Sequence, residues 1–184
     1  MYATSGDWLR RAVPATIITL TLGLSACSGS DSEPTDDLVE PTTEATVDPA
    51  VVDQQALETL VTDFWAARTS SQNNGDTSPD QFVGLLSDAM IEVETGTLAD
   101  YKELKVVRVG APEITAVEAT ASGDEGRLLA CVNEDEWTAE EDGKPVQLSQ
   151  DGPKAWGAEA ARLGDSWIIT DFLSGDESAK EKTC

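Results

Sequence analysis

Two kinds of pattern follow one another along the chain. Residues 53–104 carry helical spacing, with apolar side chains every three or four positions, as at Leu57, Leu60 and Phe64. Residues 112–173 carry β-branched residues between turns rich in glycine and aspartate. Because the helices precede the strands rather than alternate with them, the sequence predicts an α+β domain with helices packed on one face of an antiparallel sheet.

The helical segment predicts about three helices. Asp53 is the expected N-cap of the first. Ser78-Pro79-Asp80-Gln81 has the spacing of a capping box with proline at the first helical position, so a second helix is expected from there. Thr97 is expected to cap a short third helix that ends before Val106.

The second segment predicts about four strands. Glycine-containing turns such as Gly164-Asp165 separate them, so neighbouring strands are expected to be antiparallel. The expected strands are 112–121, 127–140, 154–163 and 166–173.

The N-terminus carries a positively charged start, Arg10 and Arg11, followed by a mostly apolar run over residues 12–26. This run is shorter than the roughly 20 residues that a membrane-spanning helix needs and is typical of a signal peptide. Its end, Leu24-Ser25-Ala26-Cys27, resembles a bacterial lipobox. That resemblance implies cleavage before Cys27 and a lipid on its thiol. Ordinary secretory cleavage after Ala26 and an uncleaved anchor are the alternatives.

Residues 27–52 predict an acidic tether between the signal peptide and a domain at 53–184. The segment has no lysine or arginine, so it offers little apolar surface to offset the entropy of the chain. A spacer is the expected role, with an interaction tail or a glycosylated stalk as alternatives. Its acidic residues are Asp31, Glu33, Asp36, Asp37, Glu40, Glu44 and Asp48.

Composition excludes several classes of function. The formal net charge is -23, which repels nucleic acid. The count of histidines is 0, so a Ser-His-Asp triad, a Cys-His pair and a histidine-ligated metal site are all excluded. We expect no cofactor. The acidic stretch 133–143 lacks the spacing of a calcium-binding EF-hand loop and is expected to be a solvated hairpin rim.

The order of helices and strands, "ACVNEDEW" in a middle strand, "GDSWIITDF" near the end and the terminal Cys184 resemble an NTF2-like domain. Such domains occur in lipoproteins of high-GC Gram-positive bacteria. The resemblance implies a cone whose concave face is a curved antiparallel sheet roofed by helices. Cones of this kind include enzymes and binding proteins, so the resemblance leaves the function open.

Cys131 and Cys184 form an even pair if Cys27 carries a lipid. Disulfides persist outside the cytoplasm, so the two are expected to bond and to hold down the otherwise mobile tail at the end of the chain. The alternative is a buried, inert Cys131 and a free Cys184. A nucleophilic cysteine is not expected, because no histidine can act as its base.

Five aromatic residues are candidates for a pocket or for the core. Of these, Trp65 and Trp167 lie on expected apolar faces and are predicted to be core, whereas Trp156 fits either role. Trp137, a further tryptophan outside the five, also fits either role. Tyr101, Asp88 and Asp171 have the residue types of an acid–base pair, but no motif aligns them, so no catalytic role is assigned. The five candidates are Phe64, Trp65, Tyr101, Trp156 and Trp167.

Together these features predict a lipoprotein held at the extracytoplasmic face of the cell membrane through Cys27. Its domain is expected to be a non-enzymatic binding or accessory module for a small apolar ligand or an envelope protein. The alternatives are an isomerase- or hydrolase-type enzyme, which predicts a deep apolar cavity ending in a carboxylate with a raised pKa, and a structural envelope protein.

Overall fold

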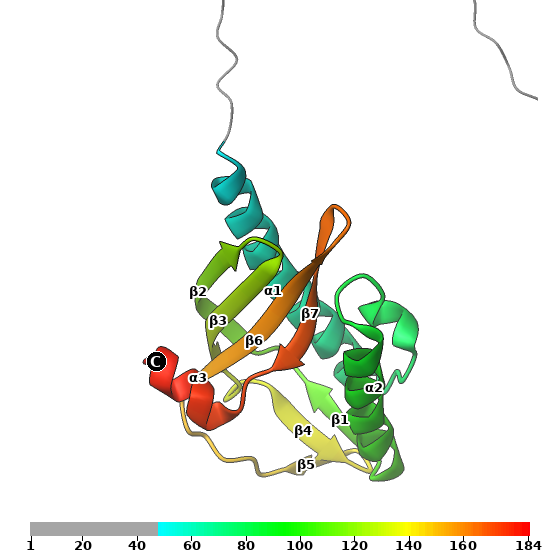
Figure 1. Cartoon of the computed structure of the whole chain (residues 1–184). Helices are drawn as coiled ribbons and strands as arrows, with labels where there is room; N and C mark the ends of the chain where they lie inside the picture. Colours follow the sequence, from blue (N-terminus) through cyan, green and yellow to red (C-terminus); the bar gives the residue numbers. More distant parts are fainter. Residues whose placement is uncertain (1–47) are drawn as a thin grey trace, which may run out of the picture. The chain divides into compact units, whose positions relative to one another are not determined.

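The computed structural model describes residues 48–184, and the predictions for the signal peptide, Cys27 and most of the tether lie outside them. The described part contains three α-helices, a short 3-10 helix and seven strands in two antiparallel sheets (Figure 1). The α+β class is confirmed, with two helical segments, α1 and α2, before the first strand. Within residues 48–184, no helix has the length and apolar character needed to cross a membrane.

Helix α1 spans Pro49–Asn74 and starts earlier than predicted. Asp48 is its N-cap and accepts a hydrogen bond from the N–H of Ala50, and Pro49 occupies the first turn. Asp53, the predicted N-cap, instead lies inside the helix and pairs with Arg162 at 2.5 Å. The helix ends at Gly75, whose left-handed conformation (φ 61°) lets its N–H bond to the carbonyl of Ser71.

The next two helices differ from the prediction. The Ser78 capping signal starts only a 3-10 turn, η1, over Pro79–Phe82. The chain then turns at Gly84 (φ 82°), and helix α2 runs over Asp88–Glu103 with Ser87 as N-cap. Thr97, the predicted cap of a separate helix, lies within α2. The break has a tertiary cause, since the N–H of Ser87 donates to the carbonyl of Ile169 and the carbonyl of Leu85 accepts from the N–H of Ile169.

The larger sheet has the strand order β2-β3-β6-β7, from Glu113–Ser122, Glu125–Asn133, Lys154–Leu163 and Ser166–Phe172. These four strands match the predicted ones, although β3 stops at Asn133 rather than continuing to residue 140. The remaining strands form a smaller sheet in the order β1-β4-β5, over Val106–Val109, Thr138–Glu141 and Lys144–Val146. The smaller sheet is not predicted from the sequence.

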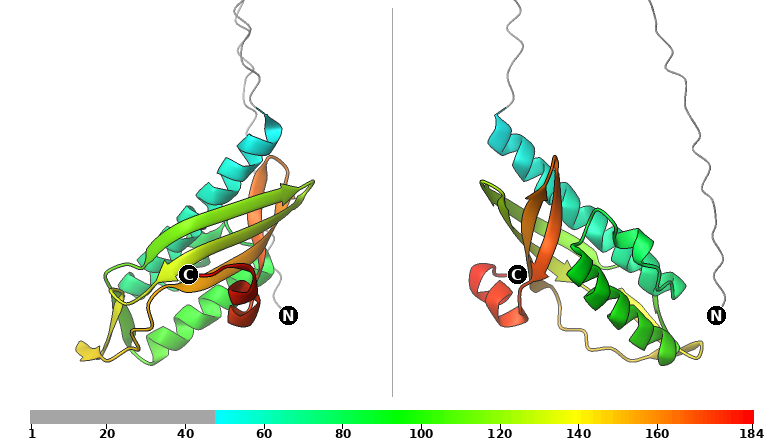
Figure 2. Two further views of the ribbon diagram at one scale, coloured as in Figure 1. Left: turned by 90° about the vertical axis from the view of Figure 1, so that its left-hand side faces the viewer. Right: turned by 45° about the vertical axis from the view of Figure 1, so that its right-hand side comes forward.

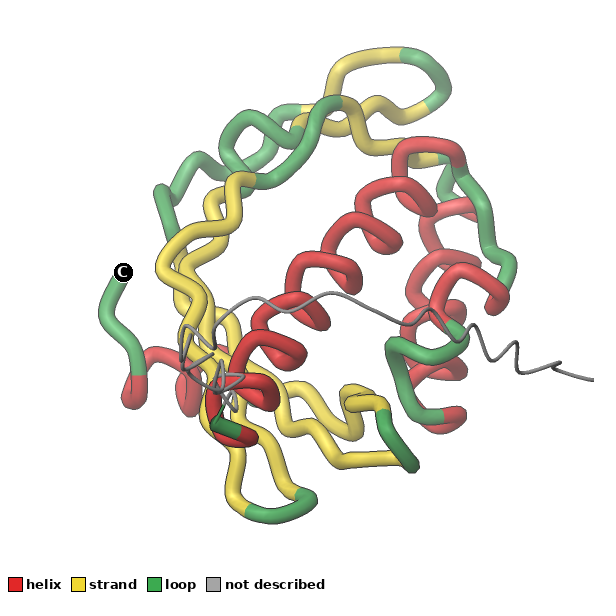
Figure 3. The backbone as a smooth tube through the Cα atoms, turned by 90° about the horizontal axis from the view of Figure 1, so that it is seen from above, coloured by secondary structure: helices red, strands yellow, loops and turns green. Residues whose placement is uncertain are grey.

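The inner face of the larger sheet, defined here as the face against α1, carries small residues at several positions of β3 and β6. Ala130 and Ala158 are fully buried there, and a Cβ added to Gly126 would lie 3.0 Å from Leu57 of α1. Because these positions supply so little volume, α1 can lay Leu57 and Phe64, both fully buried, close to the sheet. Figure 3 shows α1 between these strands and α2.

The outer face of the same sheet carries a third helix, where the sequence analysis expects only a tail. Helix α3 spans Gly175–Glu181 and starts with a capping box between Ser174 and Glu177. Figure 2 shows it on the side of the sheet opposite α1. Ser178 is buried against Gly157 of β6, and Arg127 of β3 pairs with Glu181.

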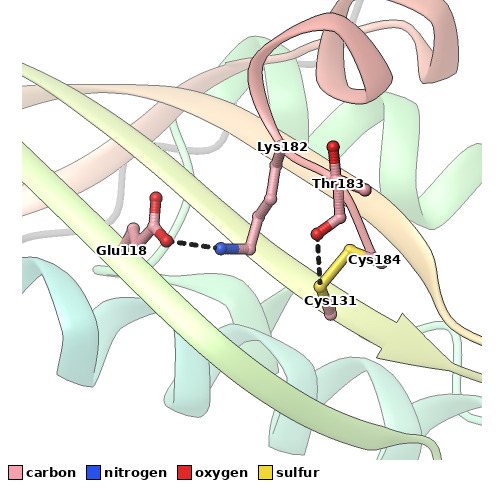
Figure 4. Close-up of a disulfide and its surroundings, with 5 residues drawn as sticks. All are labelled: Glu118, Cys131, Lys182, Thr183 and Cys184. Carbon is pink, nitrogen blue, oxygen red and sulfur yellow. Dashed lines mark hydrogen bonds and ion pairs between the residues drawn. A yellow bond between two sulfur atoms is a disulfide. The ribbon is translucent and has the colours of Figure 1, made fainter.

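A disulfide between Cys131 and Cys184 joins the end of the chain to β3, as the sequence predicted (Figure 4). The two Cα atoms are 5.7 Å apart and 53 residues apart in sequence. Beside the disulfide, the side chain of Lys182 is only 5% exposed and donates to Glu118 at 2.8 Å. A covalent bond and ion pairs therefore fasten the C-terminus to the outer face.

Candidate functional site

A cleft of about 470 Å³ opens where α1, β1 and the ends of β3 and β6 meet. Trp65 of α1, Arg108 of β1, Val132 of β3 and Trp156 of β6 line it, and the loop over residues 148–152 forms its rim. We call it the Arg108 cleft. Its volume lies within the range of small-molecule binding sites, roughly 300–1,000 Å³.

Aromatic rings form the floor of the Arg108 cleft and fill the space behind it. Trp156 stacks on Phe64 with 5.7 Å between ring centroids, and it meets Trp65 edge-on at 5.8 Å. Trp156 has room to do so because its partner across the strand pair is Ala130. The space between α1 and the larger sheet is therefore packed with side chains at this level, and the cleft lies at its edge.

Arg108 is the buried charge of the cleft, with 8% of its surface exposed. Its guanidinium lies 3.9 Å from the ring centroid of Trp137, and its Nε donates to the carbonyl of Trp137 at 3.1 Å. Its Nη2 donates to the same carbonyl and to Glu134, which lies 3.3 Å away. Stacking and hydrogen bonds thus fix the guanidinium in one place.

The rim of the cleft carries exposed charges of both signs. Lys154 donates to Asp151 at 2.6 Å, and this hydrogen bond raises the pKa of the Lys154 ammonium, with smaller contributions from Glu134 and Asp135. Asp135 also accepts from the N–H of Gly152 and so ties the rim loop to the end of β3. Within residues 48–184, no three or more ligating side chains are grouped so that they could hold a metal ion. This applies to the acidic stretch 133–143 as well.

The structure brings three of the five aromatic candidates to the cleft and separates the others. Trp65 and Trp156 line its floor, and Phe64 is fully buried directly behind them. Trp167 is buried in the core with the Arg162 guanidinium over its ring, whereas Tyr101 is half-buried on α2 and belongs to neither the core cluster nor the cleft.

Asp88 and Tyr101 lie too far apart to act as an acid–base pair. Asp88 and Tyr101 lie near opposite ends of α2, about 20 Å apart along the helix axis. Asp171 is exposed on β7. Arg108 and Lys154, the cations of the cleft, are not among the candidates of the sequence analysis, because only long-range packing brings β1, β3 and β6 together.

A second buried charge lies between α1 and α2, away from the cleft lining. Glu94 is 2% exposed, and its Oε1 lies 3.2 Å from the Nε of Arg68 without the geometry of a hydrogen bond. Burial raises the pKa of Glu94, and the charge of Arg68 partly opposes this. Buried polar atoms of Trp65, Ser71 and Gln72 on α1 likewise lack hydrogen-bond partners among the described residues.

Comparisons with protein-family models and with curated proteins give no match. Similar solved structures include the intermembrane space region of the chloroplast protein ARC6, at a TM-score of 0.50 and 16% identity, covering 66% of this chain and 95% of that one. A putative dehydratase of the NTF2-like family from Streptomyces avermitilis has a TM-score of 0.41 and 13% identity, over 67% and 99% of the two chains.

A cystatin-fold protein from Novosphingobium aromaticivorans has a TM-score of 0.35 and 14% identity, over 65% and 98% of the two chains. The structural neighbours of the chain thus include NTF2-like and cystatin-fold proteins. At these identities the likeness concerns the fold, and it gives no activity or partner.

Proposed function

We propose that the protein is a lipoprotein anchored at the extracytoplasmic face of the cell membrane, whose domain binds a small apolar ligand in the Arg108 cleft. The anchor rests on the sequence around Cys27. The binding role rests on one observation, an open cleft of about 470 Å³ with Trp65 and Trp156 on its floor. Aromatic floors offer a large contact area to a ligand at a small cost in side-chain entropy.

Three features favour binding over catalysis. An enzyme on such a cone needs a deep cavity that ends in a carboxylate with a raised pKa, but stacked rings fill the interior behind this cleft. The carboxylate whose pKa is raised by burial, Glu94, does not line the cleft. The chain also has no histidine to serve as a general base.

The binding role is tested with the neutral fluorescent probe N-phenyl-1-naphthylamine. The full chain carrying Cys27→Ser is used, so that no lipid or detergent competes for the probe. We expect saturable fluorescence enhancement that Trp156→Ala weakens about tenfold or more, because the probe loses its main contact surface. Leu148→Ser, on the exposed rim, gives a second test that spares the packed floor.

Leu163→Ala is the matched control, since Leu163 is exposed outside the cleft. Enhancement that is absent, or that survives both Trp156→Ala and Leu148→Ser unchanged, would show that the cleft does not bind apolar molecules.

The anchor is tested by the intact mass of protein extracted from membranes. We expect a chain that begins at Cys27 and carries acyl groups, and a Cys27→Ala variant that appears in the soluble fraction, because two or more acyl chains hold a protein to a bilayer. A mass that retains the first 26 residues would overturn the anchor and leave the binding test standing.

A further inference from the structure

The Arg108 cleft combines an apolar floor with one rigid cation. Arg108 is 8% exposed, stacks on Trp137 and is held by the carbonyl of that residue. Lys154, the other cation of the cleft, lies at the rim with 67% of its side chain exposed, and its ammonium is paired with the Asp151 carboxylate. A ligand that enters the cleft over Trp156 therefore meets the Arg108 guanidinium as the fixed charge at its inner wall.

A carboxylate already lies beside this guanidinium. The Oε2 atom of Glu134 is 3.3 Å from Nη2 of Arg108, and the Glu134 side chain is 48% exposed. Within the described residues, Nη1 of Arg108 takes part in no hydrogen bond, and Glu134 contacts the guanidinium through a single, long one. Glu134 thus marks the place of a carboxylate on Arg108 but does not use the two parallel bonds that an arginine can offer.

Displacing Glu134 costs little, because its half-exposed carboxylate returns to water while the incoming carboxylate takes its place on the buried guanidinium. A carboxylate attached to an apolar body has a further advantage, since burial of that body on Trp65 and Trp156 holds its head near Arg108. Guanidinium and carboxylate match in shape, so the incoming group can form the two-bond contact that Glu134 does not.

The overall negative charge of the protein opposes an anionic ligand, but mostly from a distance. Exposed carboxylates farther than about 8 Å away are largely screened at physiological salt, whereas the buried Arg108 acts at contact distance with little screening. The local fixed charge therefore has more influence on the ligand head than the net charge of the domain.

We propose that the Arg108 cleft selects amphipathic molecules with a single carboxylate head, placing the apolar part on Trp65 and Trp156 and the head on Arg108 in place of Glu134. This inference rests on the proposed ligand-binding function and specifies its ligand class. The competing ligand class is a cationic amphiphile, whose head would be bound by Glu134, Asp135 and Asp151 at the rim.

Three ligands of equal chain length separate these classes: dodecanoate, dodecanol and dodecyltrimethylammonium, each competing with N-phenyl-1-naphthylamine on the full chain carrying Cys27→Ser. We expect dodecanoate to displace the probe at a concentration about tenfold lower than dodecanol, and Arg108→Gln to abolish that advantage. Because Arg108 supports Trp137, the exposed Glu134→Gln provides the second variant. It is expected to raise dodecanoate affinity at least threefold and to leave dodecanol unchanged.

Glu136→Gln is the charge-matched control, because Glu136 is exposed next to this segment but does not line the cleft. Equal displacement by dodecanoate and dodecanol would overturn the carboxylate assignment while leaving apolar binding intact. The same holds if dodecyltrimethylammonium binds best and Glu134→Gln weakens it. Failure of the probe and of all three ligands to bind would overturn the proposed function itself, and this inference with it.

Discussion

The two faces of the larger sheet are held by different forces. The inner face contacts α1 through fully buried apolar groups such as Phe64, Leu128 and Ala158. The outer face contacts α3 and the three residues after it through a disulfide and the ion pairs Arg127–Glu181 and Lys182–Glu118. Apolar burial makes the inner face part of the cooperative core. The segment on the outer face is instead held by a few local bonds and can open separately. The two faces should therefore fail under different conditions.

The largest effect is expected from Phe64→Ala on the inner face. Phe64 is fully buried and contacts Trp65, Trp156 and Phe172, so its removal leaves a cavity that the packed sheet cannot close. The free energy of unfolding should fall by about 3–5 kcal/mol, measured by urea denaturation. Val93→Ala, at an exposed position of α2, is the control. A loss below about 1 kcal/mol would mean that the inner face is not the core.

Cys184→Ser should have a somewhat smaller effect that is concentrated on the outer face. A disulfide typically contributes about 2–4 kcal/mol. In a Cys27→Ser background, which avoids exchange with a third thiol, we expect faster amide exchange in α3 while β3 stays protected. Reduced protein without the Cys184 substitution should behave the same way. Equal loss of protection in α3 and β3 would show that the two faces unfold together.

The larger sheet and α1 can be predicted from sequence because their signals are local. The spacing of Leu57, Leu60 and Phe64 indicates a helix, and Asn74-Gly75 indicates its end. Helix α3 has a local signal too, since Ser174 and Glu177 have capping-box spacing, but the short segment around it does not carry the apolar spacing that predicts a helix.

The remaining features depend on contacts between distant residues. The loop before α2 is fixed by Ile169, and Arg108 is held by a carbonyl 29 residues away. Composition alone gives no indication of either contact, and the smaller sheet depends on similar pairings. The same reason keeps the Arg108 cleft out of the sequence prediction, although two of its floor residues, Trp65 and Trp156, are among the candidates.

Glu94→Gln tests how the layer formed by α1 and α2, which covers the inner face, responds to pH. Burial raises the pKa of Glu94 in the folded state, so the folded protein holds a proton that the unfolded chain has released. The contribution to stability is thus present below the ordinary pKa of glutamate, about 4.3, and is lost as pH rises through the raised pKa. A tenfold difference in proton affinity between the two states corresponds to about 1.4 kcal/mol. Unfolding measured across this pH range should show a shallower decline in the variant, and identical slopes would contradict the prediction.

Glu177→Gln should give the smallest effect, and with the opposite pH dependence. The hydroxyl and backbone N–H of Ser174 donate to the Glu177 carboxylate and lower its pKa. The folded state therefore releases this proton more readily than the unfolded chain, so the stabilisation is present above the ordinary pKa of glutamate and is lost as pH falls through the lowered pKa. The protection of the α3 amides, which is the slowing of exchange relative to an unstructured chain at the same pH, should fall on acidification in the wild type. It should fall much less in Glu177→Gln, where the amide side chain can still cap the helix.

Asp176→Asn is the control for this last variant, because it removes a charge from the same turn of α3 but leaves the capping box in place. If Asp176→Asn removed the acid response as fully as Glu177→Gln does, general charge rather than the capping box would be the cause. If the pH dependence of stability has opposite signs for Glu94 and Glu177, a fall in pH weakens the attachment of α3 to the outer face. A rise in pH then weakens the packing of α1 and α2 on the inner face. A uniform pH response of α1 and α3 would instead show that the two faces are one cooperative unit.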